Sequence, residues 1–121
     1  MTRTWTTRVG MYRTPPLSLN DRKHWRAKAK ITADIRAYIR EWAFYTVPAC
    51  SASEVEMHYV PRDARRRDAD NLVPILKACC DGLVDAGVVP DDTPELMRKH
   101  MPVIDAQDRA NPHLYLVVRE A

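Results

Sequence analysis

The residues best suited to chemistry in this sequence are two aspartates in the run RRRDADN, residues 65–71. Asp68 and Asp70 stand two positions apart, directly behind three arginines. If a strand continues through them, both side chains leave the same face, where like charges repel unless a cation lies between them. Carboxylate oxygens select hard cations, so the pair predicts a site for Mg²⁺, with Mn²⁺ as a substitute.

Two other interpretations of this run are structural. Either aspartate suits the N-cap of a following helix, although a cap uses one aspartate and leaves the other unexplained. The arginines and Asp68 also suit an ordinary surface ion-pair patch, in which each exposed pair contributes only about 0–1 kcal/mol. A calcium-binding loop is excluded, because it requires an acid or amide at Leu72, glycine at Val73 and glutamate at Cys79.

The distribution of charge favours a polyanionic partner. The formal net charge is +3, but residues 1–67 carry 14 Lys/Arg against 6 Asp/Glu, a net +8. Residues 68–121 carry 5 against 10, a net −5. This asymmetry indicates that the first half attracts a polyanion and that the later acids have a specific task. The alternative is solvated charge on helix surfaces.

Composition limits the class of protein. The chain has 121 residues, 45% of them hydrophobic, which predicts a single domain over residues 1–121. It lacks both a run of about 18 apolar residues and a secretory signal, so we expect a cytoplasmic protein without a membrane partner. The 3 cysteines and 4 histidines lack metal-binding spacing, so we expect reduced thiols and no zinc site.

Periodicity predicts an α+β fold, with two main helices packed on a small mixed sheet in the order β-α-β-α-β-β. The first helix is expected to begin at a cap on Asn20 or Asp21, to bury Ile31, Ile35, Tyr38, Ile39 and Trp42, and to end before Pro48. The second is expected to bury Leu72, Ile75, Leu76, Cys79 and Leu83 and to end at Gly87. Strands are expected over residues 4–13, 53–60, 97–104 and 113–119.

Lys77 and Asp81 share a side of the second helix with Asp70, since seven and eleven residues are close to two and three turns. Lys77 lies about 10 Å along the axis from Asp70 and its side chain leans towards the helix N-terminus. Its ammonium is therefore placed to approach a phosphate at the metal. The alternative is a solvated surface lysine.

Asp91 and Asp92 occupy the turn after the second helix. To bring Asp92 near Asp70, residues 87–92 must run back along the helix, which six extended residues can just achieve, since they span at most about 20 Å. The sequence DTPE that starts at Asp92 also has the form of a helix start.

In combination, the run R-R-R-D-A-D-N-L, a helix bearing K-A-C-C-D-G-L-V-D-A-G and the turn V-V-P-D-D resemble the RusA family of Holliday junction resolvases. The resemblance is strongest over residues 65–92 and extends to PPLSLN at residues 15–20 and to the order of elements. It implies a RusA-like fold and Mg²⁺-dependent cleavage of four-way DNA junctions in recombination, repair or phage DNA processing. A junction has two equivalent scissile strands, so a twofold homodimer is the expected assembly.

By this resemblance Asp68, Asp70 and Asp92 match the three family carboxylates that hold the metal. Lys77 matches the family's catalytic helix lysine, although it stands about one turn later than in much of the family. The candidates for DNA contact are Arg65, Arg66, Arg67, Asn71 and Asn20, with helix capping as the alternative role of Asn20. Asp91 and Asp81 are secondary site candidates.

Two other classes of function stay open on the sequence alone. A noncatalytic DNA-binding protein explains the arginines but not the gathered acids. A metal-dependent hydrolase of free nucleotides explains the acids but gives the basic half no task.

Overall fold

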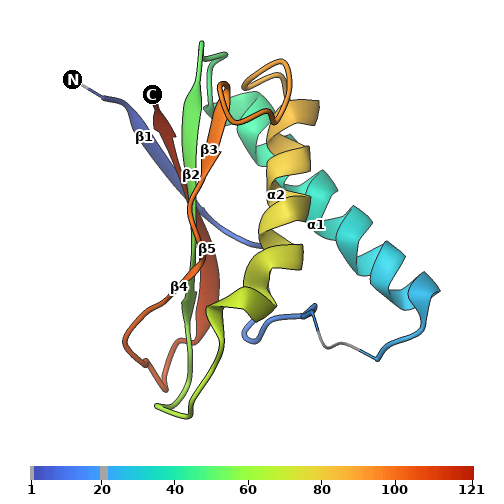
Figure 1. Cartoon of the computed structure of the whole chain (residues 1–121). Helices are drawn as coiled ribbons and strands as arrows, with labels where there is room; N and C mark the ends of the chain where they lie inside the picture. The colour runs from blue at the N-terminus through green and yellow to red at the C-terminus, as the bar shows by residue number, and fades with distance from the viewer. Residues whose placement is uncertain (1, 20–21) are drawn as a thin grey trace.

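The computed structural model of the chain describes residues 2–19 and 22–121, and within them it is a small α+β protein (Figure 1). Its elements are β1 (Thr4–Arg8), α1 (Trp25–Thr46), β2 (Ser53–Val60), the 3-10 helix η1 (Ala69–Leu72), α2 (Val73–Asp85), β3 (Met97–Lys99), β4 (Val103–Ile104) and β5 (His113–Glu120). The prediction of two main helices with a mixed sheet is confirmed. Among these residues, no helix combines the length and the apolar character needed to cross a membrane.

The sheet has the order β1-β5-β2-β3, and β4 also pairs with β2. β5 runs antiparallel to both β1 and β2, whereas β3 and β4 run parallel to β2. The β2–β5 pairing extends from Ser53 opposite Glu120 to Val60 opposite His113. β2 therefore has β5 on one side and both β3 and β4 on the other, so it is the centre of the sheet.

Two of the expected strands differ from prediction for identifiable reasons. The strand predicted over 97–104 is two short strands, β3 and β4, separated by three residues that include Pro102. Proline has no N–H to donate to a sheet ladder, so the pairing with β2 is interrupted there. The first strand ends at Arg8, ahead of Gly10, whose φ of +60° turns the chain away.

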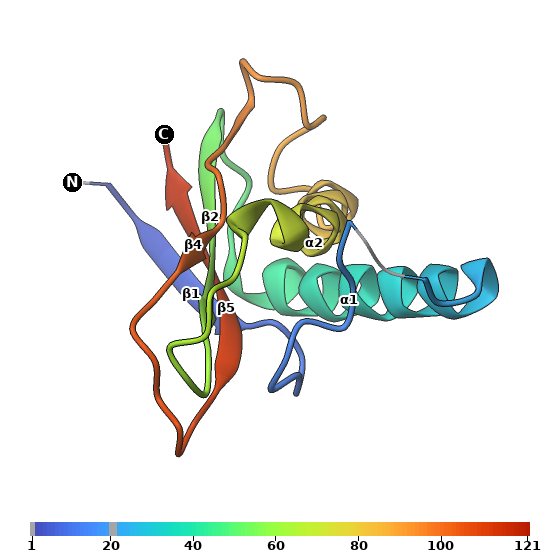
Figure 2. The same ribbon diagram turned by 60° about the horizontal axis from the view of Figure 1, so that its bottom comes forward.

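Both α1 and α2 lie on the same side of the sheet, as the two ribbon views agree (Figures 1 and 2). The alternation predicted for residues 53–60 is confirmed, because Val55, Met57 and Tyr59 are buried towards the helices. The helices contribute Ile35, Ile39, Ala43, Ile75, Leu76, Ala78, Cys79, Cys80 and Leu83 to the same core. Cys79 and Cys80 are thus core residues, as expected.

α1 begins later than its sequence predicts. Its first residue is Trp25, and His24 is the N-cap, with the Nδ1 atom accepting a 3.1 Å hydrogen bond from the Arg26 backbone N–H. The predicted caps, Asn20 and Asp21, lie outside the described residues. The predicted end is confirmed, since the helix stops at Thr46, ahead of Pro48.

The end of α2 follows the predicted glycine signal. Gly87 has a φ of +83°, its N–H donates to the Val84 carbonyl, and the Val88 N–H donates to the Leu83 carbonyl. This is the Schellman arrangement, in which a left-handed glycine satisfies the last carbonyls of a helix. Val88 and Leu83 are both buried, so the turn that leads to Asp92 is anchored in the core.

At Gly82 the backbones of α1 and α2 approach each other closely. A Cβ atom at this position would lie 2.6 Å from the backbone oxygen of Arg36 and 3.1 Å from the Cβ of Ile39. The absence of a side chain therefore sets the distance between the helices.

The outer face of the sheet carries a polar network centred on His58. Its Nε2 lies 2.7 Å from Glu56 Oε1 and its Nδ1 lies 2.8 Å from Asp105 Oδ1. The imidazole stacks on Tyr115 at 4.6 Å between ring centroids, and Arg119 donates to the second oxygen of Glu56. Burial lowers the pKa of His58, but the hydrogen bonds with Asp105 and Glu56 outweigh it and hold the pKa above its ordinary value.

Replacement of Gly82 by alanine is expected to destabilise the protein by about 1–3 kcal/mol, because the new methyl group meets rigid backbone. At an unconstrained helical position the same change stabilises by up to about 1 kcal/mol. Urea unfolding followed by circular dichroism measures the difference. An unchanged or higher midpoint for Gly82→Ala would contradict the packing described above.

The His58 network is expected to make stability depend on pH. Because the folded pKa is raised, its contribution is complete below the unfolded pKa of about 6.5 and is lost as pH rises through the folded value. The free energy of unfolding should therefore fall above pH 6.5 more steeply in the wild type than in His58→Gln. If the free energy of unfolding depends on pH in the same way in both proteins, the His58 imidazolium does not stabilise the fold.

Candidate metal and nucleic-acid site

The strand that was to carry the two aspartates ends too early to do so. β2 stops at Val60, Pro61 follows, and the chain enters a loop that reaches Asp68. Asp70 lies in η1. The argument that strand alternation places both carboxylates on one face is therefore wrong, and the loop and the 3-10 helix position them instead.

Asp63 organises this loop. Its Oδ1 accepts hydrogen bonds from the Arg65 backbone N–H at 3.0 Å and from the Arg67 guanidinium at 2.8 Å. These two bonds hold the pKa of the Asp63 carboxyl below its ordinary value. The same guanidinium donates to the carbonyls of residues 63 and 65 and lies 5.7 Å from the centre of the Tyr59 ring.

Arg67 therefore shapes the loop from within, with only 21% of its side chain exposed. Its predicted contact with DNA stays a prediction, but most of its donors are already used in the loop. Arg65 and Arg66 are exposed. Arg65 approaches Asp63 only at 3.9 Å, so both arginines present cationic groups to solvent, and their predicted contact with DNA stays a prediction.

Asp68 and Asp70 are exposed and unpaired. Asp68 precedes η1 without a side-chain cap hydrogen bond, and α2 is likewise uncapped by a side chain at Leu72. Neither aspartate forms a side-chain hydrogen bond or ion pair with any residue that the structure describes. The capping and surface ion-pair interpretations are thus both wrong for these two residues.

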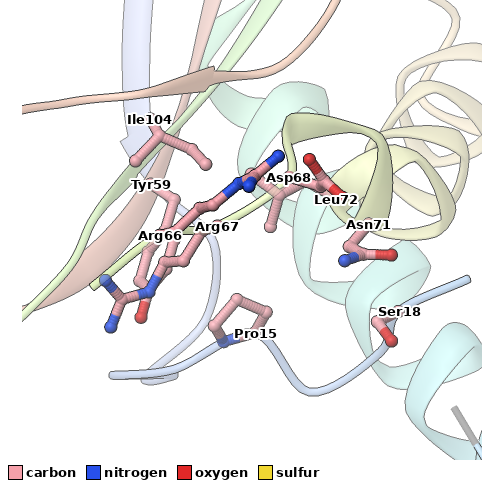
Figure 3. A pocket seen from close by; sticks show the side chains of 9 residues that line it. All are labelled: Pro15, Ser18, Tyr59, Arg66, Arg67, Asp68, Asn71, Leu72 and Ile104. Atoms are coloured by element: carbon pink, nitrogen blue, oxygen red, sulfur yellow. The ribbon is translucent and has the colours of Figure 1, made fainter. Parts of the chain in front are cut away.

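A pocket of about 500 Å³ opens beside Asp68 (Figure 3). It is formed where the loop after β2 and η1 meet the N-terminal loop, and it is lined by Pro15, Ser18, Tyr59, Arg66, Arg67, Asp68, Asn71, Leu72 and Ile104. Three predicted DNA-contact residues and one predicted metal ligand therefore share one cavity. Of the two other contact candidates, Arg65 does not line this pocket and Asn20 lies outside the described residues.

The other predicted site residues form a second group along α2. Lys77 Nζ lies 2.9 Å from Asp81 Oδ1 and 3.0 Å from Asp92 Oδ2. Lys99 Nζ lies 2.9 Å from the same Asp92 oxygen. The return of the chain along α2 thus brings Asp92 to Lys77, while Asp91 accepts a hydrogen bond from the Asp92 backbone N–H.

The two lysines dominate the electrostatics of this group. Hydrogen bonds from Lys99 and Lys77 lower the pKa of Asp92 to about 2, so its carboxylate is ionised at neutral pH. Hydrogen bonds with Asp81 and Asp92 raise the pKa of Lys77. Two of the three ammonium donors of Lys77 are used, which leaves one for an incoming anion.

Lys99 was not a sequence candidate, although the sequence holds a signal for it. It stands two positions after buried Met97 on an edge strand, so its side chain leaves the face that packs on the helices. Its side chain is 31% exposed, compared with 71% for Arg98, which faces the other way. A lysine at an inward-facing edge position commonly has a partner, here Asp92.

DTPE does not begin a helix. The N–H groups of Leu96 and Met97 both donate to the Thr93 carbonyl, which makes a turn that enters β3. The helix-start interpretation of Asp92 is therefore wrong, and the carboxylate is used for ion pairs instead.

The donor chemistry suits a hard cation at Asp68 and Asp70. No group of three or more His, Cys, Asp and Glu side chains among the described residues is placed to hold a metal ion, so Asp92 does not join this pair here. Mg²⁺ is, however, usually bound by one or two carboxylates together with water and substrate phosphates. Two unpaired carboxylates meet that requirement, and a shared ion at all three acids stays a prediction.

Loss of Lys99 is expected to raise the pKa of Asp92 from about 2 towards the ordinary aspartate value of about 3.9. NMR titration of the Asp92 carboxyl carbon in Lys99→Gln measures this change. Arg98→Gln is the matched control, because Arg98 pairs with Glu54 on the opposite face. If Lys99→Gln titrates like the wild type, the ion pair between β3 and Asp92 does not exist in solution.

Comparison with known proteins adds no assignment, since no protein-family model and no curated protein sequence matches the chain. The function has to be argued from the site itself.

Proposed function

We propose that the protein is a Mg²⁺-dependent, structure-selective endodeoxyribonuclease that cleaves four-way DNA junctions. One observation carries the proposal: Asp68 and Asp70 are exposed, unpaired carboxylates two residues apart, and Asp68 lines a pocket of about 500 Å³ together with Arg66 and Arg67. Carboxylates left without a partner next to cationic groups suit a metal ion that bridges protein and phosphate. The resemblance of residues 65–92 to the RusA family supports the same reaction.

The proposed roles follow from where the side chains lie. Asp68 and Asp70 would hold the ion, which when bound supplies a water of lowered pKa and positive charge opposite the phosphoryl oxygens. Arg66 lines the same pocket and is exposed, so it would bind a backbone phosphate. Asn71 would add an amide at the pocket wall.

Lys77 and Asp92 take supporting roles in this proposal. Lys77 retains one free donor for a phosphoryl oxygen, and charge at that position stabilises the transition state. Asp92, held by Lys77 and Lys99, orients the ammonium and keeps it protonated. If the Asp92 carboxylate exchanged one of these ion pairs for a contact with the metal, it would become the predicted third ligand.

The wider setting is part of the same proposal. We place the protein in the cytoplasm of a bacterium or of a phage-infected bacterium, where it would process branched DNA. A RusA-like homodimer would present one site to each of the two equivalent strands of a junction.

A noncatalytic DNA-binding protein is the second candidate. It is favoured by the ion pairs of Asp92, which occupy one of the three predicted ligands. This reading accounts for Arg65 and Arg66 but leaves the unpaired Asp68 and Asp70 without a task.

Cleavage of a synthetic four-way junction, measured with Mg²⁺ or with chelator and beside linear duplex, separates the two candidates. Asp70→Asn is expected to lower the cleavage rate at least about 100-fold, because it removes a ligand charge. Junction binding should be retained or strengthened, since the arginines are untouched and a negative charge is lost.

Asp34→Asn is the matched control, since Asp34 is an exposed α1 carboxylate paired with Lys30. It should cut like the wild type. Retained cleavage by Asp70→Asn would end the metal assignment, and a wild-type protein that binds junctions tightly without cutting them would establish the noncatalytic candidate.

A further inference from the structure

A second pocket, of about 510 Å³, lies at the end of the sheet where the loops gather. Four arginines line it, Arg13 from the N-terminal loop, Arg62 and Arg65 from the loop after β2, and Arg109 from the loop before β5. Asp63 is the acid in its wall. We call this cluster the arginine pocket.

Hydrogen bonds between the loops hold the arginine pocket in shape. The Asp108 backbone N–H donates to the Pro61 carbonyl at 2.8 Å, which joins the loop before β5 to the loop after β2. Arg8 donates to Asn111 Oδ1 at 3.0 Å, which joins the first of these loops to the end of β1. Three segments far apart in sequence are therefore fixed side by side, and little order is lost when a ligand binds.

The arginines of this pocket keep most of their donors. Arg62 and Arg65 approach Asp63 only at 3.5 and 3.9 Å, and their side chains are 60% and 72% exposed. The closest ion pair of Asp63 goes instead to Arg67, at 2.8 Å. Arg109 has no side-chain partner among the described residues, so the pocket presents a strong net positive charge.

The chemistry of the lining favours a nucleic-acid backbone phosphate over a free nucleotide. Arginine forks match phosphate oxygens, and none of the lining side chains is an aromatic ring of the kind on which nucleotide-binding sites stack a base. Recognition would be independent of sequence, as is usual for contacts to phosphates.

The arginine pocket also lies close to the proposed catalytic residues. Arg65 lines it while the next residue, Arg66, lines the pocket of Asp68, so the two pockets flank one loop. Arg65 and Asp68 are three positions apart, so their Cα atoms lie at most about 10 Å from each other. Phosphates bound at the two pockets would therefore lie within a few base pairs of each other along a duplex.

We propose that the arginine pocket binds a second backbone phosphate of the DNA, a few base pairs from the phosphate cleaved at Asp68 and Asp70. This inference rests on the proposed function for the position of the scissile phosphate. Its role is to set the direction in which a duplex arm leaves the site.

The test is binding of a fluorescently labelled 20-base-pair duplex, followed by anisotropy from 50 to 200 mM salt. Arg62→Gln/Arg109→Gln is expected to bind at least about 5-fold more weakly at 50 mM salt. The slope of log affinity against log salt should fall by about one, because one phosphate contact is lost. Thermal unfolding of each variant confirms that these exposed changes leave the fold intact.

Arg98→Gln is the matched control, with an equally exposed arginine on the outer face of β3. In this variant, the affinity and the slope should change by no more than the loss of one distant charge would cause. The inference is overturned if the double variant binds the duplex like the wild type, or if Arg98→Gln loses as much affinity as the double variant. It is also overturned if the wild type does not bind DNA, or if the double variant loses only the binding of a phosphopeptide.

Failure of the inference differs from failure of the proposed function. If the double variant binds DNA more weakly and the wild type never cuts a junction, the arginine-pocket proposal stands and the proposed nuclease function is wrong. If the double variant binds DNA normally and the wild type cuts junctions, the proposed nuclease function stands and the arginine-pocket proposal is wrong.

Discussion

The packing of α2 between α1 and the sheet is the constraint on which the rest of the structure depends. Its inner face is buried along its whole length, and at Gly82 it touches the backbone of α1 without a side chain between them. A helix fixed on that face has no freedom to rotate about its axis. Lys77 is therefore held on the outer side, and η1 with Asp70 is held at the rim of the sheet, beside the end of β2.

The central position of β2 explains why residues distant in sequence meet around this helix. β3 and β4 follow α2 and pair with β2 in parallel, so the chain has to return along α2 before it enters the sheet. Asp92 lies on that return path, between Lys77 of α2 and Lys99 of β3. The ion pairs thus follow from the topology, and they fasten the returning segment to both elements.

Much of the fold could be predicted because local signals and burial agree. The alternation in β2, the stripe on α2 and the turn at Gly87 each follow one simple rule and are confirmed. The start of α1 and the break in the third predicted strand could not be predicted, because several weak local signals compete at each place. At α1, for example, His24 acts as the N-cap, although residues of more usual capping types precede it. For the site, the sequence singled out Asp68 and Asp70 as candidates but gave the wrong reason for their placement, since the loop after β2 is shaped by hydrogen bonds of Arg67 to residues 63 and 65.

Those contacts explain how two carboxylates stay unpaired beside a run of arginines. Arg67 is the arginine nearest to Asp68 in sequence, yet its guanidinium is turned back on Asp63 and on two loop carbonyls. Asp63 therefore spares Asp68 an ion pair that would neutralise it. Asp68 and Asp70 thus have no cationic partner among the described residues, which leaves both carboxylates open to the cation that the proposed function requires. In the proposed metal site, an acid five residues before Asp68 would thus influence how strongly the two carboxylates attract a cation, because it holds the Arg67 guanidinium away from them.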